Sequence, residues 1–201
     1  MIKHFSFVHR GYYHYRYSLP NTDTLNNGFL SLKNYLENLH KICPNEYFQS
    51  GPRSSQLKFN LNVDKLEIKG HEISQLAKKA IETNGNTHTN IQVFFLNNDK
   101  KTIASEIPIW FEPHEIKESD YSLNTDKPLT GHIDLLRKED NKIWVWDYKP
   151  NAEKEKYAST QIYFYTLMLS KRTNIPLKYF RCGYFNEKIA YVFKPENGRL
   201  H

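Results

Sequence analysis

Two acids and a lysine lie close together in the second half of this 201-residue chain. Asp134 ends the stretch Gly131-His132-Ile133-Asp134. The second acid and the lysine are Asp147 and Lys149, in the segment Asp147-Tyr148-Lys149. Paired carboxylates can bind a divalent cation, and a neighbouring lysine can hold or deprotonate a water or offset charge on a phosphoryl group. These residue types, in this order, therefore favour metal-dependent hydrolysis of a phosphodiester.

The segment between the acids predicts a β-hairpin, because a polar centre is flanked by apolar runs. A two-residue turn at Asp140-Asn141, which tolerate positive φ, would set residue 139 opposite 142 and Asp134 opposite Asp147. Their Cβ atoms would then be about 4.5–5.5 Å apart, with Lys149 on the same face. The side chains expected on the other face are Trp144, Trp146 and Tyr148. Two adjacent carboxylates repel each other, so the pair implies a cation; a surface salt-bridge cluster is the alternative.

A helix is predicted over Ala152–Arg172, directly after the hairpin. Acids lie in its first turn and bases in its last, and Pro176 follows. Its middle is apolar on nearly all sides, so it should pack into a core. Gln161 and Tyr165 are four residues apart and share one face. The alternative is that both residues are structural. Tyr165 would then pack in the core with its hydroxyl at the rim, and Gln161 would cap a backbone group.

These three motifs together resemble the PD-(D/E)XK nuclease superfamily and, within it, the RecB-like branch. The G-x-x-D strand, D-x-K strand and Q-x-x-x-Y helix of that branch occur here as Gly131–Asp134, Asp147–Lys149 and Gln161–Tyr165. The resemblance implies an α/β, restriction-endonuclease-like core with a central mixed sheet flanked by helices. It also implies a Mg²⁺- or Mn²⁺-dependent deoxyribonuclease, either an exonuclease or an endonuclease, in DNA repair, recombination, replication or genome processing.

The resemblance also implies roles for single residues. Asp134, Asp147 and the backbone carbonyl of Tyr148 would hold the metal, and Lys149 would assist the water. The Gln and Tyr of the helix motif would support the site or the DNA backbone.

Two further ligands are expected from the same resemblance. The branch carries an upstream glutamate, and Glu106 stands near the start of a predicted strand over Thr102–Phe111, with Glu112 as a second candidate. The branch also often has a histidine on a helix before the sheet, and His71 lies in a helix predicted near Asp64–Thr83. An exposed strand glutamate and a solvated histidine at a helix start are the respective alternatives.

Residues 1–60 are predicted to form an aromatic and basic extension, largely irregular, of a nuclease core at 61–201; one domain over 1–201 is the alternative. Rings alternate there with cationic groups, as on surfaces that stack bases and contact phosphates. The candidate nucleic-acid contacts are Arg10, Arg16, Tyr13, Tyr15 and Tyr17. Alternating tyrosines are equally typical of one face of a β-strand. The remaining elements are predicted as a helix near Gly28–Ile42 and strands near Ile91–Leu96, Leu129–Arg137, Lys142–Lys149, Lys178–Phe185 and Ile189–Lys194.

Composition agrees with a nucleic-acid partner, because the formal charge is +6 and the pI is about 9.1. The expected partner is DNA, either single- or double-stranded. Two cysteines exclude a four-thiolate iron–sulfur cluster within one chain. The chain has no GxxxxGK[ST] pattern, so we expect no nucleotide cofactor, and a helicase or recombination partner would be a separate protein. The absence of a long apolar run or signal-like segment predicts a soluble, intracellular protein without a membrane partner.

Two other functions remain compatible with the sequence. One is a catalytically weak nucleic-acid-binding or assembly subunit that keeps the nuclease fold. The other is a protein-interaction domain without a nucleic-acid role. The complete set of two acids and a lysine argues against the assembly subunit, and only the loose glutamate and histidine matches favour the interaction domain.

Overall fold

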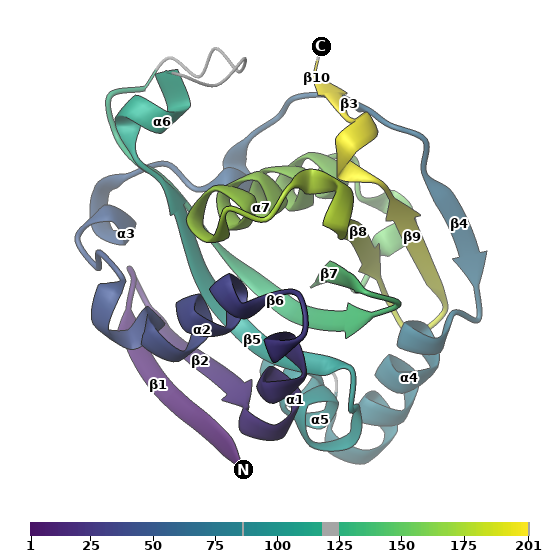
Figure 1. The fold of residues 1–201 in the computed structure, drawn as a ribbon. Coiled ribbons are helices and arrows are strands. Elements are labelled where there is room, and N and C mark those ends of the chain that lie inside the picture. Colours follow the sequence, from purple (N-terminus) through teal and green to yellow (C-terminus); the bar gives the residue numbers. More distant parts are fainter. Residues whose placement is uncertain (86, 118–124, 201) are drawn as a thin grey trace.

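A mixed eight-stranded sheet lies at the centre of the computed structural model, which describes residues 1–85, 87–117 and 125–200 (Figure 1). In order across the sheet, the strands are β1 (Ile2–Val8), β2 (Tyr12–Ser18), β5 (Thr102–Phe111), β6 (Leu129–Glu139), β7 (Lys142–Tyr148), β8 (Phe180–Phe185), β9 (Ile189–Phe193) and β4 (Leu66–Lys69). Neighbouring strands are antiparallel except β7 and β8, which are parallel.

Helices pack on both faces of this sheet (Figure 1). On one face, α2 (Leu30–Ile42) and α7 (Ala158–Thr173) bury side chains such as Leu36 and Ile162 in the larger apolar core. On the other, α4 (Glu72–Asn84) and α5 (His88–Asn98) bury Ile73 and Phe95 in a second core. The predicted α/β fold, a mixed sheet flanked by helices, is confirmed and agrees with a restriction-endonuclease-like core.

Short elements connect these layers. They are α1 (Leu19–Asp23), η1 (Thr24–Asn26), α3 (Tyr47–Ser50), η2 (Ser54–Gln56), α6 (Pro113–Lys117), η3 (Ala152–Lys154), η4 (Leu177–Tyr179) and η5 (Pro195–Asn197), together with a separate pair of strands, β3 (Leu61–Asn62) and β10 (Arg199–Leu200). Within the described ranges, no helix is both long enough and apolar enough to cross a membrane.

The predicted hairpin between the two acids is confirmed. Glu139 pairs with Lys142, and the turn residues Asp140 and Asn141 have φ values of 49° and 55°. A two-residue type I′ turn requires such left-handed values at both positions. The three aromatic side chains of β7 contact the core under α4 and α5, whereas Val145 contacts the opposite core. The predicted alternation of faces is therefore present.

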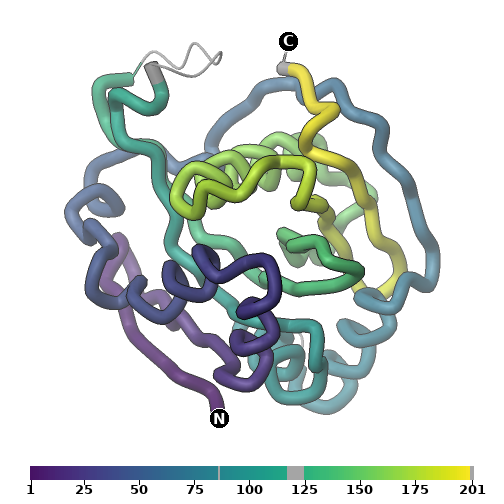
Figure 2. The backbone as a smooth tube through the Cα atoms, in the orientation of Figure 1, coloured from purple at the N-terminus to yellow at the C-terminus, as the bar shows by residue number. Residues whose placement is uncertain are grey.

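The start of the chain is not irregular, and this part of the prediction is wrong. β1 and β2 form an antiparallel hairpin, and β2 joins the central sheet where Arg16 pairs with Ser105. The backbone trace begins at this edge, and the two ends of the chain lie at opposite sides of the molecule (Figure 2). The tyrosine alternation in β2 reflects a strand with one buried face, because Tyr15 is fully buried and donates to the carbonyl of Leu36 at 2.8 Å.

The strand predicted over Ile91–Leu96 is wrong, since these residues belong to α5. The side chain of Thr87 accepts a hydrogen bond from the amide of Asn90 at 3.2 Å and caps this helix. A short apolar run that is buried fits a strand and a buried helix equally well. The cap and the packing against β5 decide for the helix.

Two predicted helix starts are also too early. The helix expected from Asp64 begins at Glu72, because β4 occupies Leu66–Lys69 and Gly70, with φ of 65°, separates the two elements. The helix expected from Ala152 begins at Ala158, after the 3₁₀ turn η3. The acids of the predicted first turn of that helix therefore precede it.

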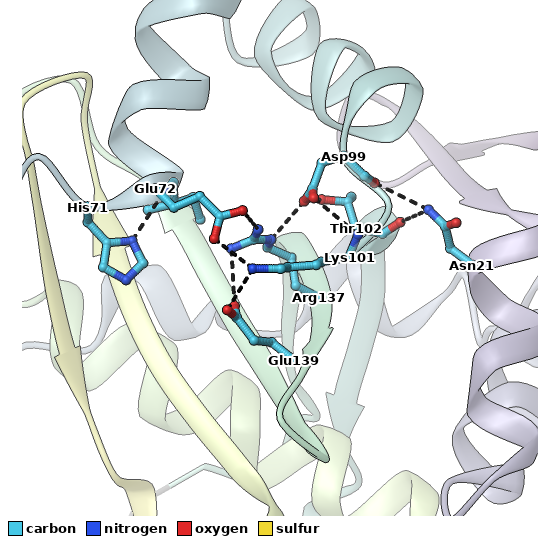
Figure 3. Close-up of polar contacts among 9 residues, drawn as sticks. Asn21, His71, Glu72, Asp99, Lys101, Thr102, Arg137 and Glu139 are labelled. Atoms are coloured by element: carbon cyan, nitrogen blue, oxygen red, sulfur yellow. Dashed lines mark hydrogen bonds and ion pairs between the residues drawn. The ribbon is translucent and has the colours of Figure 1, made fainter.

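A buried arginine joins α4 and α5 to the sheet (Figure 3). Arg137 on β6 is fully buried, with Nε 2.8 Å from Asp99 Oδ2 and Nη2 3.3 Å from Glu72 Oε1. Lys101 Nζ lies 2.6 Å from Glu72 Oε2 and 2.7 Å from Glu139 Oε1. The network holds the first residue of α4 and the connection from α5 to β5 against β6, the strand that carries the first acid motif.

We expect Arg137→Ala to lower the free energy of unfolding by about 3–5 kcal/mol, because it leaves the buried carboxylate of Asp99 without its cation. Urea unfolding followed by circular dichroism measures this loss. Lys100→Ala, a change at an exposed position between α5 and β5, is the control and should alter stability by about 0.5 kcal/mol or less. Equal losses in the two variants would contradict the role given to Arg137.

Candidate active site

Three carboxylates stand in a row across three neighbouring strands. Ile107 of β5 pairs with Ile133 of β6, so in the same register Glu106 stands opposite Asp134. The hairpin register places Asp147 of β7 on the other side of Asp134. Adjacent positions on neighbouring strands share one face of a sheet. The row Glu106, Asp134 and Asp147 therefore follows from two strand registers.

The hairpin ladder ends where the acids begin. Its last pair is Leu135 with Trp146, and beyond it the amide of Tyr148 donates to Asp134 Oδ2 at 2.9 Å. The N–H and C=O of one extended residue point toward the same neighbouring strand. The carbonyl of Tyr148, which was predicted to be a metal ligand, is accordingly on the β6 side.

A cavity of about 340 Å³ lies over the acids. From α7, the crossover helix between β7 and β8, Gln161 Nε2 donates to Tyr165 Oη at 2.6 Å, and both side chains line the cavity. Lys149 Nζ lies 2.6 Å from Asp147 Oδ2. The predicted site residues that line this cavity are Glu106, Asp134, Asp147, Lys149, Gln161, Tyr165 and Tyr13. The fold brings them together, and their individual roles stay predictions.

Two of the acids in this cavity have raised pKa values, because they are buried close to other carboxylates. Burial and the charge of Asp134 raise the pKa of Asp147 to about 7, although Lys149 acts in the opposite direction. Burial and Asp134 also raise the pKa of Glu106 to about 7. Burial lowers the pKa of Lys149, but Asp147 and Asp134 raise it by more. A divalent cation would let the carboxylates ionise together, so the donor set fits such an ion.

Comparison with protein-family models agrees with this arrangement of strands and acids. Residues 60–198, more than half of the chain, match the model of the PD-(D/E)XK nuclease superfamily. The chain belongs to this superfamily. A search of curated proteins finds no sequence similar to it. Members of the superfamily are generally nucleases that act on nucleic acids, typically with divalent metals such as Mg²⁺.

The ligands expected in a PD-(D/E)XK nuclease are only partly assembled from side chains. Over the ranges that the structure describes, no group of three or more His, Cys, Asp or Glu side chains is arranged so that it could hold a metal ion. Mg²⁺ is usually bound through one or two carboxylates and keeps several waters as well as substrate oxygens. The facing pair Asp134 and Asp147 fits this open kind of site.

Glu106, and not Glu112, reaches the cavity of the superfamily fold. It has a φ of 52°, in the left-handed region that is uncommon for residues other than glycine. Gln92 of α5 donates to Glu106 Oε1 at 2.6 Å and fixes the carboxylate. Glu112 directly follows β5, with its Oε1 3.9 Å from Arg172 Nη1. The structure thus brings the preferred candidate, Glu106, to the cavity, but from the middle of β5 and not from its start.

The histidine that reaches the acids is His88, and His71 lies elsewhere. Nδ1 of His71 accepts from the amide of Ile73 at 3.2 Å and caps α4, with its ring beside Trp146. Nδ1 of His88, at the start of α5, lies 3.5 Å from Asp134 Oδ2, and this contact raises the pKa of His88. The prediction of His71 as a ligand is corrected, because the helix that approaches the acids is α5.

Only one of the predicted nucleic-acid contacts at the N-terminus lines the cavity. Tyr13 does so, whereas Arg10 donates to two backbone carbonyls near the hairpin tip and Arg16 lies outside the cavity. Tyr15 and Tyr17 are 0% and 5% exposed. A base-stacking role for these last two tyrosines is wrong, because no face of either ring is open to a base.

Sequence reasoning missed three other residues of the cavity wall. His132 stacks on Tyr13 with ring centroids 3.8 Å apart, and its Nε2 lies 2.9 Å from His9 Nδ1. Arg53 and Ser55, from the turn after α3, also line the cavity. His132 belongs to the G-x-x-D motif itself, but its partner lies more than a hundred residues away in the chain, so no local pattern indicates the contact.

Proposed function

We propose that this chain is a Mg²⁺- or Mn²⁺-dependent deoxyribonuclease of the RecB-like branch, acting in DNA repair, recombination, replication or genome processing. The convergence of Glu106, Asp134, Asp147 and Lys149 in one cavity is the observation that carries this proposal. The order of the three motifs supports the branch, because the Q-x-x-x-Y pair of α7 lines the same cavity. The proposal includes neither an iron–sulfur cluster nor a nucleotide cofactor, and any helicase or recombination motor would be a separate protein.

Asp134 and Asp147 would hold the metal, together with the Tyr148 carbonyl and Glu106. His88 replaces His71 as the candidate histidine, because it contacts Asp134. When bound, the metal would polarise a phosphoryl oxygen and lower the pKa of a water. The chain's own contribution is to keep the ligands on neighbouring strands of a rigid sheet.

Lys149 is the cation that the chain places beside the metal ligands. Its ammonium group has three N–H donors, and the contact with Asp147 leaves others for a water or a phosphoryl oxygen. The neighbouring carboxylates raise its pKa, so these charges favour the protonated form. In that form Lys149 orients the attacking water and offsets charge that develops on the phosphoryl group.

Gln161 and Tyr165 complete the wall from α7. Tyr165 is buried, and its hydroxyl accepts from the Gln161 amide. The side-chain carbonyl of Gln161 then stays available to Lys149 or to a water. We assign the pair to support of the site and of the DNA backbone.

A nuclease assay with and without chelator tests the proposed function. We expect cleavage of labelled DNA in Mg²⁺ or Mn²⁺, its loss in EDTA, and its return when excess metal is added, because the acids need a cation to ionise together. Single-stranded DNA, double-stranded DNA and RNA serve as parallel substrates. Cleavage that is unchanged by EDTA contradicts metal dependence, and metal-dependent DNA binding without cleavage favours an assembly subunit.

A further inference from the structure

Part of the cavity wall comes from residues that precede the region matched by the superfamily model. Arg53 and Tyr13 line the cavity, whereas the match begins at residue 60. The N-terminal segment therefore does more than extend the sheet. It contributes a cation and an aromatic ring to the same space as the three acids.

Three contacts fix the Arg53 guanidinium. Nη2 donates to the carbonyl of His9 at 2.6 Å, and Nη1 donates to the hydroxyl of Tyr13. The guanidinium carbon lies 5.2 Å from the centre of the Tyr13 ring, within the range of a cation–π contact. The Arg53 backbone bridges to Thr130, the residue before the G-x-x-D motif. The orientation of the Arg53 guanidinium is therefore set before any ligand binds.

The charge of Arg53 is not balanced by these contacts, since a carbonyl and a hydroxyl are both neutral. None of the ion pairs recorded among the described residues includes Arg53. By contrast, the guanidinium groups of Arg137 and Arg172 contact carboxylates. A guanidinium has five N–H donors, and the two side-chain bonds of Arg53 leave others for a ligand.

A fixed guanidinium with free donors suits a phosphate, because its planar fork matches phosphate oxygens. Arg53 shares the cavity with the acids yet lies beyond ion-pair distance of Glu106, Asp134 and Asp147. The acids therefore leave the charge of Arg53 unpaired, and a phosphate of a strand bound in this cavity can contact it.

We propose that Arg53 binds a backbone phosphate of the nucleic-acid strand in this cavity, and that Tyr13 and the carbonyl of His9 position its guanidinium for this contact. The inference rests on the proposed nuclease function and extends it to substrate binding. A purely structural Arg53, which only ties the N-terminal hairpin to β6, is the competing explanation.

A binding titration separates these two explanations. We would measure fluorescence anisotropy of a labelled short single-stranded DNA in Ca²⁺ at several salt concentrations, with melting temperatures to verify folding. Arg53→Ala should weaken binding by about 10-fold or more and reduce the dependence of log K on log[salt] by about 0.7. Arg53→Lys should restore the salt dependence but not the full affinity, because the fork is lost.

Two further variants make the test specific. Tyr13→Phe removes the hydroxyl that holds Nη1 but no charge, so it should weaken binding and leave the salt dependence unchanged. Arg199→Ala removes a charge outside the cavity and should change neither quantity. In cleavage assays, Arg53→Ala should raise KM.

Unchanged affinity and salt dependence in folded Arg53→Ala would overturn the inference, as would an equal effect of Arg199→Ala. If Arg53→Ala does not fold, an Arg53→Lys protein with full wild-type affinity overturns it. Absence of cleavage by the wild type would refute the nuclease function, whereas the titration in Ca²⁺ would still test Arg53. Cleavage by the wild type with no effect of Arg53→Ala on binding would refute only the present inference.

Discussion

Asp147→Asn should abolish cleavage, lowering turnover by at least about 10³-fold, while the protein stays folded. The variant removes one of the two carboxylates that face each other across the hairpin, and with it a metal ligand and its electrostatic contribution to the transition state. Asp134→Asn should have the same effect. Turnover of labelled DNA in Mg²⁺ and Mn²⁺, with circular dichroism to verify folding, measures both.

Asp140→Asn is the matched control for these variants. It makes the same chemical change in the same hairpin, at a turn position with φ of 49° that asparagine also tolerates. Its activity should equal that of the wild type. Wild-type turnover by a folded Asp147→Asn protein would remove Asp147 from the active site.

Asp147→Asn should also be more stable than the wild type when metal is absent, by an amount that depends on pH. The pKa of Asp147 is raised to about 7, so folding favours its protonated form. The stability that this contributes is present below the unfolded pKa of about 4 and is lost as pH rises through about 7. The melting temperature of Asp147→Asn should therefore exceed that of the wild type at pH 8 by more than at pH 5. Addition of Mg²⁺ should narrow the difference at pH 8.

Lys149→Ala should slow cleavage by about 10²–10⁴-fold, as expected for one positioned electrostatic or proton-transfer group. Lys149 contacts Asp147 but is not itself a ligand, so binding of Mn²⁺ should largely persist. Single-turnover cleavage and calorimetric titration with Mn²⁺ measure the two quantities separately.

Lys142→Ala provides the comparison, because Lys142 lies at the other end of β7 and its Nζ donates to the carbonyl of Lys178 on the surface. Its turnover should match that of the wild type. Complete loss of Mn²⁺ binding in Lys149→Ala would contradict an orienting role and would make the lysine part of the metal site.

The hairpin and its acids could be predicted from the sequence because short-range rules govern them. A turn of two residues that tolerate positive φ, Asp140 and Asn141, sets the register, and the register places Asp134 opposite Asp147. A four-residue spacing then gives Gln161 and Tyr165 one face of α7. Each step depends on neighbours in the chain, so the sequence alone determined them.

Helix α5 shows where local pattern is insufficient. The apolar run Ile91–Leu96 fits a buried strand and a buried helix equally. The strand prediction did not take into account Thr87, the residue that caps the helix. Once α5 packs on β5, Ile91 and Phe95 are fully buried and His88 reaches Asp134. Which histidine reaches the acids thus depended on tertiary packing.

The N-terminal wall of the cavity was decided by tertiary structure alone. Burial under α2 turns Tyr15 into a core residue, and only Tyr13 of the three tyrosines faces the acids. Arg53 and His132 meet residues of the first hairpin that are far from them in sequence. Such contacts form when the sheet and its helices bury apolar surface together, and no local propensity indicates which distant side chains that burial brings into one cavity.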